Sequence, residues 1–434
     1  MKKTFILTLM MAVVFSVAAQ FPMADDYRAA ANIGDASAQC ALGICYEQGW
    51  GTEKNIEKAI EWLTKAANQG YRQAQSTLGN IYSDGRHLPK DPAKAEYWNK
   101  KAVDQCMTDA TAGNAEAQFD LAEMYEKGWH GLDVDYSKSI YWFTKAANQG
   151  HLLAQCHLGR CYFYGIHGVQ QDLAKAAEWK LKAAEQGHVM EQADLTEIYY
   201  NGWGVARDFG KVLFWGDKME QNPKAVSSVT KKPEYFMGLA CYYGGYGVTK
   251  DYDKAAQWFR KSSAADYPLA QCMLAWCYYQ GTGVAEDDSK AVYWWKKAVE
   301  AVDGTESDYK LRDKGLIYQS QYMIGVCYAN GTGVTQDLEK AATWFRKAAD
   351  RGYAVAQNEL GDCYYYGRGV DKNFARAFYW YQKAAEQEQP DAQYSLAFCY
   401  RDGEGVEKDE DKAWYWLVKA AKNGHKDAKE IVGD

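Results

Sequence analysis

Residues 390–424 read PDAQYSLAFCYRDGEGVEKDEDKAWYWLVKAAKNG, and residues 354–388 read AVAQNELGDCYYYGRGVDKNFARAFYWYQKAAEQE. In both stretches apolar side chains recur three or four positions apart on either side of a Gly-x-Gly-Val segment. That spacing places apolar residues on one face of an α-helix, and the paired glycines are typical of a turn. Each stretch therefore predicts two amphipathic helices joined by a short connection.

The same unit recurs along the chain, marked by a Tyr that a Trp follows 16 or 17 residues later. The Tyr positions are Tyr46, Tyr82, Tyr125, Tyr162, Tyr199, Tyr242, Tyr278, Tyr328, Tyr364 and Tyr400, and the Trp positions are Trp62, Trp98, Trp142, Trp179, Trp215, Trp258, Trp294, Trp344, Trp380 and Trp416. A period near 36 repeated this often is the signature of a solenoid built from stacked units. We therefore predict ten copies, numbered one to ten, at 36–70, 72–106, 114–150, 151–187, 188–222, 231–266, 267–303, 318–352, 353–388 and 389–424, with insertions near 107–113, 223–230 and 304–317.

The consensus Ala-x-x-x-Leu-Gly-x-x-Tyr, Gly-x-Gly-Val, Lys-Ala-x-x-Trp-x-x-Lys-Ala-Ala-x-x-Gly resembles the Sel-one-like repeat, a relative of the tetratricopeptide repeat. The resemblance implies an all-α fold, a right-handed superhelical α/α solenoid of about ten two-helix repeats over 36–434, which acts as an adaptor or scaffold. Copies two, five and six depart most: His87-Leu88-Pro89 replaces the turn, Thr196 and Leu239 replace the small residue, and Gly216 follows Trp215.

The first 19 residues have the pattern of a secretory signal peptide. Lys2 and Lys3 precede an apolar stretch, and Val17 and Ala19 are the small residues expected before a cleavage site. We predict cleavage after Ala19, a lead-in at 20–35, and a mature protein that is periplasmic or secreted and has no membrane span.

The charge balance argues against a nucleic-acid partner. The chain has a net charge of −7 and no run of Lys or Arg, whereas binding to a phosphate backbone depends on clustered cations. We therefore predict a protein or peptide partner or a glycan, and no nucleic acid.

Ten of the eleven cysteines fall into two columns on the first helices, seven directly before the Tyr position and three five residues earlier. Five residues on a helix separate two side chains by about 140°, so members of the two columns cannot bridge within a helix. We interpret them as small buried thiols. Cys106 stands outside both columns and is a candidate reactive thiol.

No catalytic, cofactor-binding or metal-binding residues are predicted. His157 and Cys161 have a spacing that metal sites use, but Cys161 belongs to the buried column. A secreted branch of the resembled family is associated with β-lactam binding, which leaves a β-lactam-binding hydrolase as an alternative. Its Ser-x-x-Lys matches begin at Ser228 and Ser307, and no Lys-Thr-Gly or Ser-Asp-Asn segment completes such a site.

Positions that vary between copies indicate where a partner binds. The columns five before, two before and one after the Tyr vary strongly and share a helix face, which we expect to line the concave surface. In copies three to five this face is charged, with Asp120, Glu123, Glu126, His157, Arg160, Asp194 and Glu197, as in a solvated surface. In copies six to eight it carries an apolar strip, defined as Met237, Tyr243, Met273, Trp276, Tyr279, Met323 and Val326.

Met and aromatic side chains adapt to varied apolar partners, so we predict that the apolar strip binds a peptide. The alternative is that the strip packs against another part of the chain, such as the 301–317 insertion. A third reading is binding of glycans or cell-wall fragments, for which aromatics must alternate with polar residues on one face. Copies nine and ten come closest to that pattern, with Glu359, Asp362, Tyr365, Phe398 and Arg401.

Overall fold

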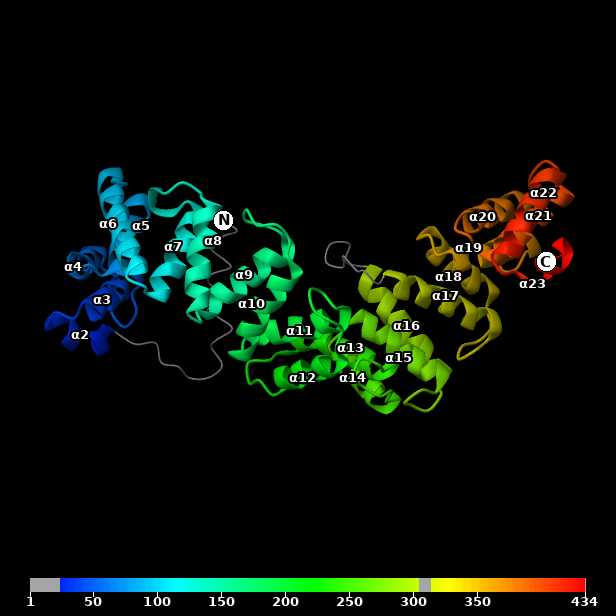
Figure 1. Ribbon diagram of the computed structural model, residues 1–434, viewed down its shortest axis with the longest axis horizontal. Coiled ribbons are helices and arrows are strands. Elements are labelled where there is room, and N and C mark those ends of the chain that lie inside the picture. The colour runs from blue at the N-terminus through cyan, green and yellow to red at the C-terminus, as the bar shows by residue number, and fades with distance from the viewer. Residues whose placement is uncertain (1–23, 304–313, 434) are drawn as a thin grey trace. The chain divides into compact units, whose positions relative to one another are not determined.

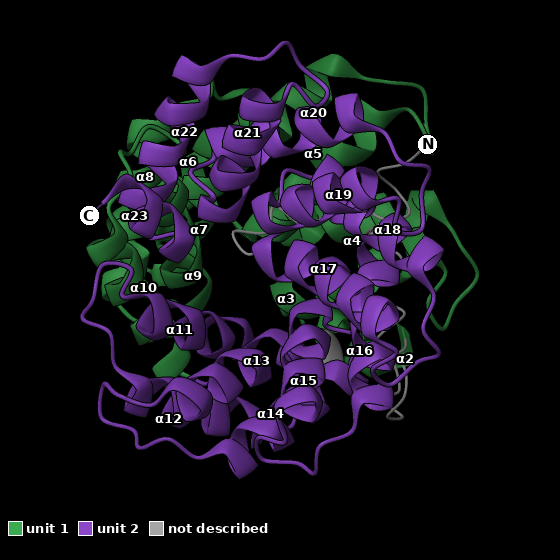
Figure 2. Cartoon of the chain, turned by 90° about the vertical axis from the view of Figure 1, so that its right-hand side faces the viewer, with its two compact units in different colours: residues 1–186 green, residues 187–434 purple. Residues whose placement is uncertain are grey.

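The computed structural model describes residues 24–303 and 314–433, which form helices and no strand (Figure 1). The predicted signal peptide lies outside these residues, as do Ser307 and most of the third insertion. The chain divides into two compact units, residues 1–186 and 187–434, coloured separately in Figure 2. Each unit is described by itself.

Unit 1 contains the lead-in helix and the helix pairs of copies one to four. Its helices are α2 (Ala24–Asn32), α3 (Ala36–Gln48), α4 (Ile56–Asn68), α5 (Arg72–Asp84), α6 (Pro92–Thr111), α7 (Ala115–Lys127), the short 3₁₀ helix η1 (Trp129–Gly131), α8 (Tyr136–Asn148), α9 (Leu152–Tyr164) and α10 (Leu173–Glu185). The first insertion, near 107–113, extends α6 to 20 residues.

Unit 2 contains the helix pairs of copies five to ten and a final short helix. Its helices are α11 (Val189–Asn201), α12 (Phe209–Glu220), α13 (Ser227–Tyr243), α14 (Tyr252–Ala264), α15 (Pro268–Gln280), α16 (Asp288–Asp303), α17 (Lys314–Asn330), α18 (Leu338–Asp350), α19 (Ala354–Tyr366), α20 (Phe374–Glu386), α21 (Pro390–Asp402), α22 (Glu410–Lys422) and α23 (Lys426–Val432). Both units confirm the prediction of an all-α solenoid of two-helix repeats.

Each second helix begins at a side-chain cap. In the ninth copy the side-chain oxygen of Asn373 accepts a hydrogen bond from the backbone amide of Arg376, 2.9 Å away. This bond satisfies one of the first-turn amides that a helix cannot pair internally. Equivalent bonds are made by Asn55, Asp91, Asp135, Asp172, Asp208, Asp251, Asp287, Asp337 and Asp409.

The two helices of a copy approach closely because the first carries a small residue at the contact. A Cβ atom added to Gly361 would lie 2.6 Å from the ring of Tyr381, closer than such atoms can pack. The residue after the conserved Trp fills this contact in most copies, as Leu63, Phe143 and Phe345 do. The small residue on the first helix therefore determines how closely the two helices of a copy approach each other.

Buried glutamines connect successive helices, and the sequence analysis did not identify them. The amide nitrogen of Gln357 donates to the carbonyl of Ala349 at 3.1 Å, and its side-chain oxygen accepts from Gln387 at 2.7 Å. Gln39, Gln75, Gln118, Gln155, Gln271 and Gln393 make the same bond to the carbonyl eight residues earlier. The sequence does contain a sign of these bonds. In nine of the ten copies a Gln lies seven positions before the residue whose carbonyl accepts a hydrogen bond from the backbone amide of the capping Asn or Asp.

The register of copy six differs by one residue from the one expected. In copy nine the amide of the capping Asn373 donates to the carbonyl of Tyr364, whereas in copy six the amide of Asp251 donates to the carbonyl of Cys241 rather than of Tyr242. Cys241 therefore occupies the Tyr position of this copy. Gly238, against which Phe259 packs, is then the small residue, so Leu239 does not replace it.

Candidate functional site

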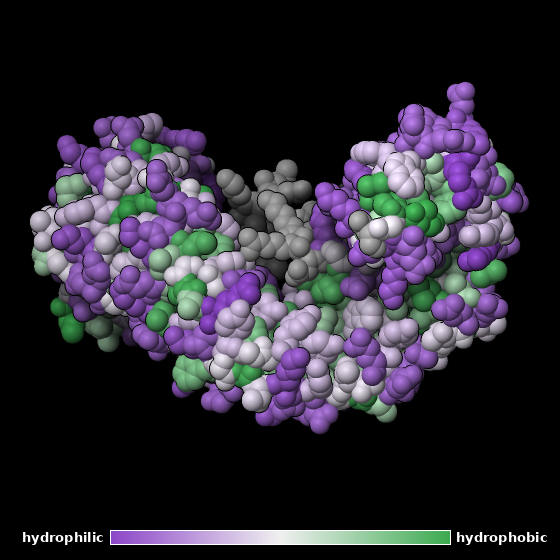
Figure 3. Space-filling view, turned by 45° about the vertical axis from the view of Figure 1, so that its right-hand side comes forward, coloured by the Kyte–Doolittle hydropathy of each residue, from purple (hydrophilic) through white to green (hydrophobic). Residues whose placement is uncertain are grey.

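Three of the seven residues of the apolar strip are not open to solvent. Met237, Met273 and Met323 are buried, so the expectation that these three line an open surface is wrong. Tyr243 is 52% exposed, while Trp276, Tyr279 and Val326 are partly exposed. On the face in Figure 3, hydrophobic residues form small separate patches among hydrophilic ones.

The burial of Met237 follows from the register of copy six. Counted from Cys241, Met237 is four positions earlier, which is the core position that Leu360 holds in copy nine. Gly216 leaves the space for it, because a Cβ atom there would lie 2.2 Å from the Met237 sulfur. The departures from the repeat pattern at Gly216 and at Leu239 thus belong to one packing arrangement.

Met273 and Met323 are covered because the first helices of their copies pack on each other. Helix α15 contacts α17 directly, and the Ser320 hydroxyl lies 3.1 Å from the Cys272 sulfur. What remains of the strip is an aromatic group in which Trp276 stands 5.9 Å from Tyr279 and 5.5 Å from the buried Trp295, between ring centroids.

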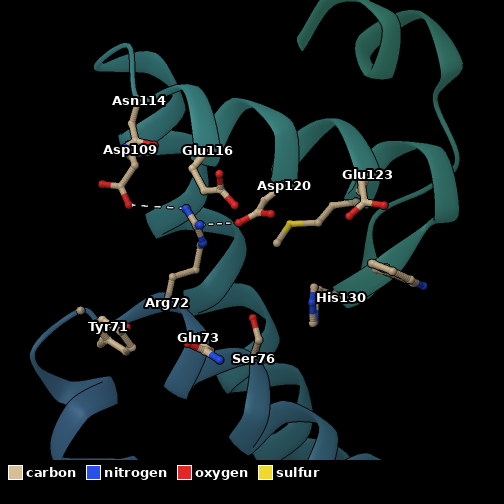
Figure 4. A pocket seen from close by; sticks show the side chains of 13 residues that line it. Tyr71, Arg72, Gln73, Ser76, Asp109, Asn114, Glu116, Asp120, Glu123 and His130 are labelled. Atoms are coloured by element: carbon tan, nitrogen blue, oxygen red, sulfur yellow. Dashed lines mark hydrogen bonds and ion pairs between the residues drawn. The ribbon is translucent and has the colours of Figure 1, made fainter. Parts of the chain in front are cut away.

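Unit 1 contains a cavity of about 630 Å³ between helices of copies two and three (Figure 4). It is lined by Gly70, Tyr71, Arg72, Gln73, Ser76, Asp109, Asn114, Glu116, Asp120, Glu123, Met124, Trp129 and His130. Asp120 and Glu123 belong to the variable face that the sequence predicts, but nothing in the periodic pattern indicates a cavity there. The lining residue Asp109 comes from the part of α6 that the first insertion adds.

Arg72 is the central charge of this pocket. Its guanidinium forms an ion pair with Asp120 and lies 3.9 Å from Asp109, and both contacts are drawn in Figure 4. Burial raises the pKa of Asp120, and the guanidinium opposes that rise. Burial lowers the pKa of His130, so its imidazole is neutral at pH 7.

Four carboxylates face one guanidinium in the lining, which gives the pocket a net negative charge. Glu123 contacts Lys127 at 2.5 Å, and Glu116 contacts His151 at 3.0 Å. A charged ligand can exchange surface contacts of this kind at low cost, because an exposed ion pair such as Glu123–Lys127 contributes little stability.

A second cluster of polar side chains lies in unit 1 at the contact of copies three and four. The Glu126 carboxylate is 2.9 Å from Nε2 of His157 and 2.7 Å from Nδ1 of His167. The ring of His157 stacks on Phe143, with centroids 4.0 Å apart. The spacing in the sequence pairs His157 with Cys161, but in the structure His157 lies against Glu126 of the preceding copy.

The cysteines directly before the Tyr, Cys45, Cys161, Cys277, Cys327, Cys363 and Cys399, are buried as predicted, and Cys241 at the Tyr position of copy six is buried as well. In the second column Cys40 and Cys272 are buried, whereas Cys156 is only partly buried, so the prediction is wrong for that residue. Cys106 is also buried, its thiol lies 3.3 Å from the carbonyl of Ala117, and burial raises its pKa to about 11. A thiol in that environment is a poor nucleophile, so its interpretation as a reactive cysteine is wrong.

Most of the polar groups expected to hold a glycan in copies nine and ten already have partners within the chain. Asp362 accepts a hydrogen bond from Tyr381 at 2.6 Å, the Tyr365 hydroxyl donates to Glu404, and Arg401 pairs with Asp402. Glu359 is partly buried, which raises its pKa. Asp362, Tyr365 and Arg401 are therefore already engaged within the chain.

Among the described helices, none combines the length and apolar character that crossing a bilayer requires. No curated protein sequence matches the chain. The chain is similar to a protective antigen present in uropathogenic Escherichia coli strains, whose crystal structure displays an SLR fold: identity is 31%, the match covers 95% of this chain and 89% of that one, and the TM-score is 0.57.

It is also similar to a Sel1 repeat protein from Oxalobacter formigenes, with 30% identity over 78% of this chain and 92% of that one and a TM-score of 0.58. The family model for the Sel1 repeat matches ten times, at residues 36–71, 72–105, 115–151, 152–188, 192–219, 234–267, 268–303, 319–353, 354–388 and 390–425. These matches cover most of the chain, and each includes parts of both helices of one copy. The protein therefore belongs to the Sel1 repeat family.

Proposed function

We propose that the protein is an exported, non-catalytic scaffold that binds a partner protein through the pocket of unit 1. Solenoids of this family have the fold of protein-interaction modules, and the N-terminal sequence has the pattern of a signal peptide. The observation that carries the proposal is the pocket itself, a hollow of about 630 Å³ with four carboxylates.

The lining defines the chemistry of the partner. A Lys or Arg side chain entering the pocket would meet Asp109 and Asp120 and compete with Arg72 for them. Trp129 at the edge is 47% exposed and offers apolar contact to the stem of such a side chain. The partner we propose is a protein segment that carries basic residues.

Reversing charge in the pocket tests this proposal. The double variant Glu116→Lys/Glu123→Lys should lose the partner in a pull-down from envelope extract, with captured proteins identified by mass spectrometry. The matched control is Glu61→Lys/Glu178→Lys, which makes the same charge change on exposed side chains of α4 and α10 outside the pocket. Circular dichroism checks that both variants fold.

Capture lost by the pocket variant and kept by the control supports the proposal. Equal capture by both shows that the pocket is not the contact surface. The interaction should also weaken steeply between low and high salt, because exposed charges are screened beyond ~8–10 Å at physiological ionic strength.

Glycan binding is a second candidate, favoured by the same lining. The lining combines Tyr71 and Trp129 with Gln73, Asn114 and Asp109, which is the mixture of aromatic and polar groups that sugar rings require. A glycan array with cell-wall fragments separates the two candidates, since stacking and neutral hydrogen bonds keep their strength in salt. Binding to the array that Trp129→Ala abolishes would favour the glycan.

The exposed remainder of the apolar strip is a second proposed contact surface. Trp276, Tyr279 and Val326 are partly exposed, and Trp and Tyr are frequent hot spots of interfaces. Trp276→Ala in the same pull-down measures its contribution independently of the pocket. Unchanged capture would remove this surface from the proposal.

A further inference from the structure

We infer that Glu126, His157 and His167 form a binding site for a divalent transition-metal ion, for which Zn²⁺ is the expected occupant. One donor atom from each residue lies within 4.8 Å of the other two. Glu126 belongs to α7, His157 to α9 and His167 to the loop after α9, so the ion would link copies three and four of unit 1.

The three donor atoms are enclosed and aimed at one another. The side chains of Glu126 and His157 are 8% and 10% exposed, and that of His167 is 29% exposed. Although Glu126 Oε1 lies close to both imidazoles, neither approach has the geometry of a hydrogen bond, and Oε1, Nε2 and Nδ1 all remain unsatisfied. Buried polar atoms without partners are costly, and a shared cation would satisfy all three.

The donor set suits zinc. Two imidazole nitrogens and one carboxylate oxygen are a ligand set that zinc accepts when it keeps a fourth position open. Donors bound at ~2.0–2.2 Å in a tetrahedron stand about 3.4 Å apart, so the separations of 2.9 and 2.7 Å need to widen by only about half an ångström. The exposed edge of His167 leaves the fourth position for water or for a group from a partner.

Arg160 opposes metal binding. Its replacement should therefore strengthen the affinity for metal, whereas loss of a ligand should weaken it. Its guanidinium lies 3.1 Å from Nδ1 of His157, which holds the proton of that imidazole on Nε2. A metal at Nε2 requires the other tautomer, and the ligand's second nitrogen then donates to an acceptor. Arg160 is exposed, so it can turn away, and Arg160→Gln would supply an acceptor in its place.

The preceding loop contains a matched control. His130 and His167 each lie between two glycines of a helix-connecting loop, and both have positive φ, 57° and 58°. His130 contacts the amide oxygen of Asn99 at 2.8 Å instead of a carboxylate. Asn tolerates positive φ better than most residues, so His167→Asn and His130→Asn remove the imidazole with little backbone strain.

Zinc is titrated into tag-free mature protein, in a reducing buffer, against a chromogenic chelator. We expect one ion per chain in the wild type, at least ~100-fold weaker binding in His167→Asn, unchanged binding in His130→Asn and tighter binding in Arg160→Gln, since loss of even an outer-shell partner weakens metal sites by 10–100-fold. Visible absorption of bound Co²⁺ reports the coordination geometry, and the thermal midpoint should rise with Zn²⁺ in the wild type but not in His167→Asn.

Two results would overturn the inference. One is a wild type that retains no Zn²⁺ in competition with the chelator, in which case the three residues are a polar contact between repeats. The other is equal binding by His167→Asn and the wild type, which would place the ion elsewhere in the chain. Neither result bears on the partner pocket, whose test does not depend on metal.

Discussion

Copies six and nine, both in unit 2, are each built from a pair of helices. They differ in which residue of the first helix occupies the Tyr position of the repeat. In copy nine Tyr364 accepts the bond from the helix cap, and Leu360 packs in the core four residues earlier. In copy six Cys241 accepts that bond, and Met237 takes the core position. Aligning the copies by their most conspicuous aromatic places Tyr242 one residue out of register.

One residue on a helix rotates a side chain by about 100°, enough to move it from the core to the variable face. The comparison shows that a backbone hydrogen bond, rather than an aromatic side chain, defines the register of a repeat. It also explains why Met237 is buried although it lies five residues before Tyr242.

The largest expected effect comes from emptying the Met237 position. Met237→Ala should lower the free energy of unfolding by about 2–5 kcal/mol, because it removes a fully buried side chain from the hollow made by Gly216. Urea unfolding followed by circular dichroism measures the change. The control is Met190→Ala on α11, whose side chain is 52% exposed and which should change stability by less than about 0.5 kcal/mol. Similar values for the two variants would refute the register.

A smaller effect is expected from the glutamine bond in copy nine. Gln357→Ala leaves the carbonyl of Ala349 and the amide of Gln387 without their partner, at a cost of about 1–3 kcal/mol. Gln387→Ala removes only the exposed end of the same connection and should cost less than half as much. If the exposed residue proves as important as the buried one, the buried bond does not stabilise the contact between copies.

The smallest effect is a gain in copy six, where Glu234 occupies the glutamine position. Its side chain is buried, Oε2 has no hydrogen-bond partner, and burial raises its pKa. Glu234→Gln should therefore stabilise the protein at pH 7 by about 1 kcal/mol.

The pH dependence of that gain has a definite sign. The folded protein holds the Glu234 proton more tightly than the unfolded chain, so the contribution of Glu234 to stability is present at acid pH and lost as pH rises through the raised pKa. The advantage of Glu234→Gln should accordingly shrink between pH 7 and pH 4 in urea unfolding experiments. An advantage that grows toward acid pH would contradict the assignment.

The repeat architecture was predictable because it depends on local patterns. The caps, the small column and the apolar spacing each act within one copy, and Asn373, Gly361 and Leu360 occupy the places that their residue types predict. The buried cysteine column follows from the same periodicity.

The site residues were less predictable because they depend on contacts between copies. The pocket needs Asp109 from the extended α6 together with Arg72 and Asp120 from α5 and α7. Likewise Glu126 and His157 are 31 positions apart and belong to different copies. A periodic pattern shows which face a residue shares, but not which loop or lengthened helix will stand opposite it.

The glutamine connection has a consequence for how this chain can change in length. Gln393 bonds to Ala385 as Gln357 bonds to Ala349, so copies nine and ten receive the same donor at the same acceptor. A chain without residues 354–389 would bring Gln393 to the carbonyl of Ala349 and restore the same bond between the joined copies. Copies that share this bond are thus interchangeable at that contact, and duplication or loss of one is a route by which such a gene can lengthen or shorten its product.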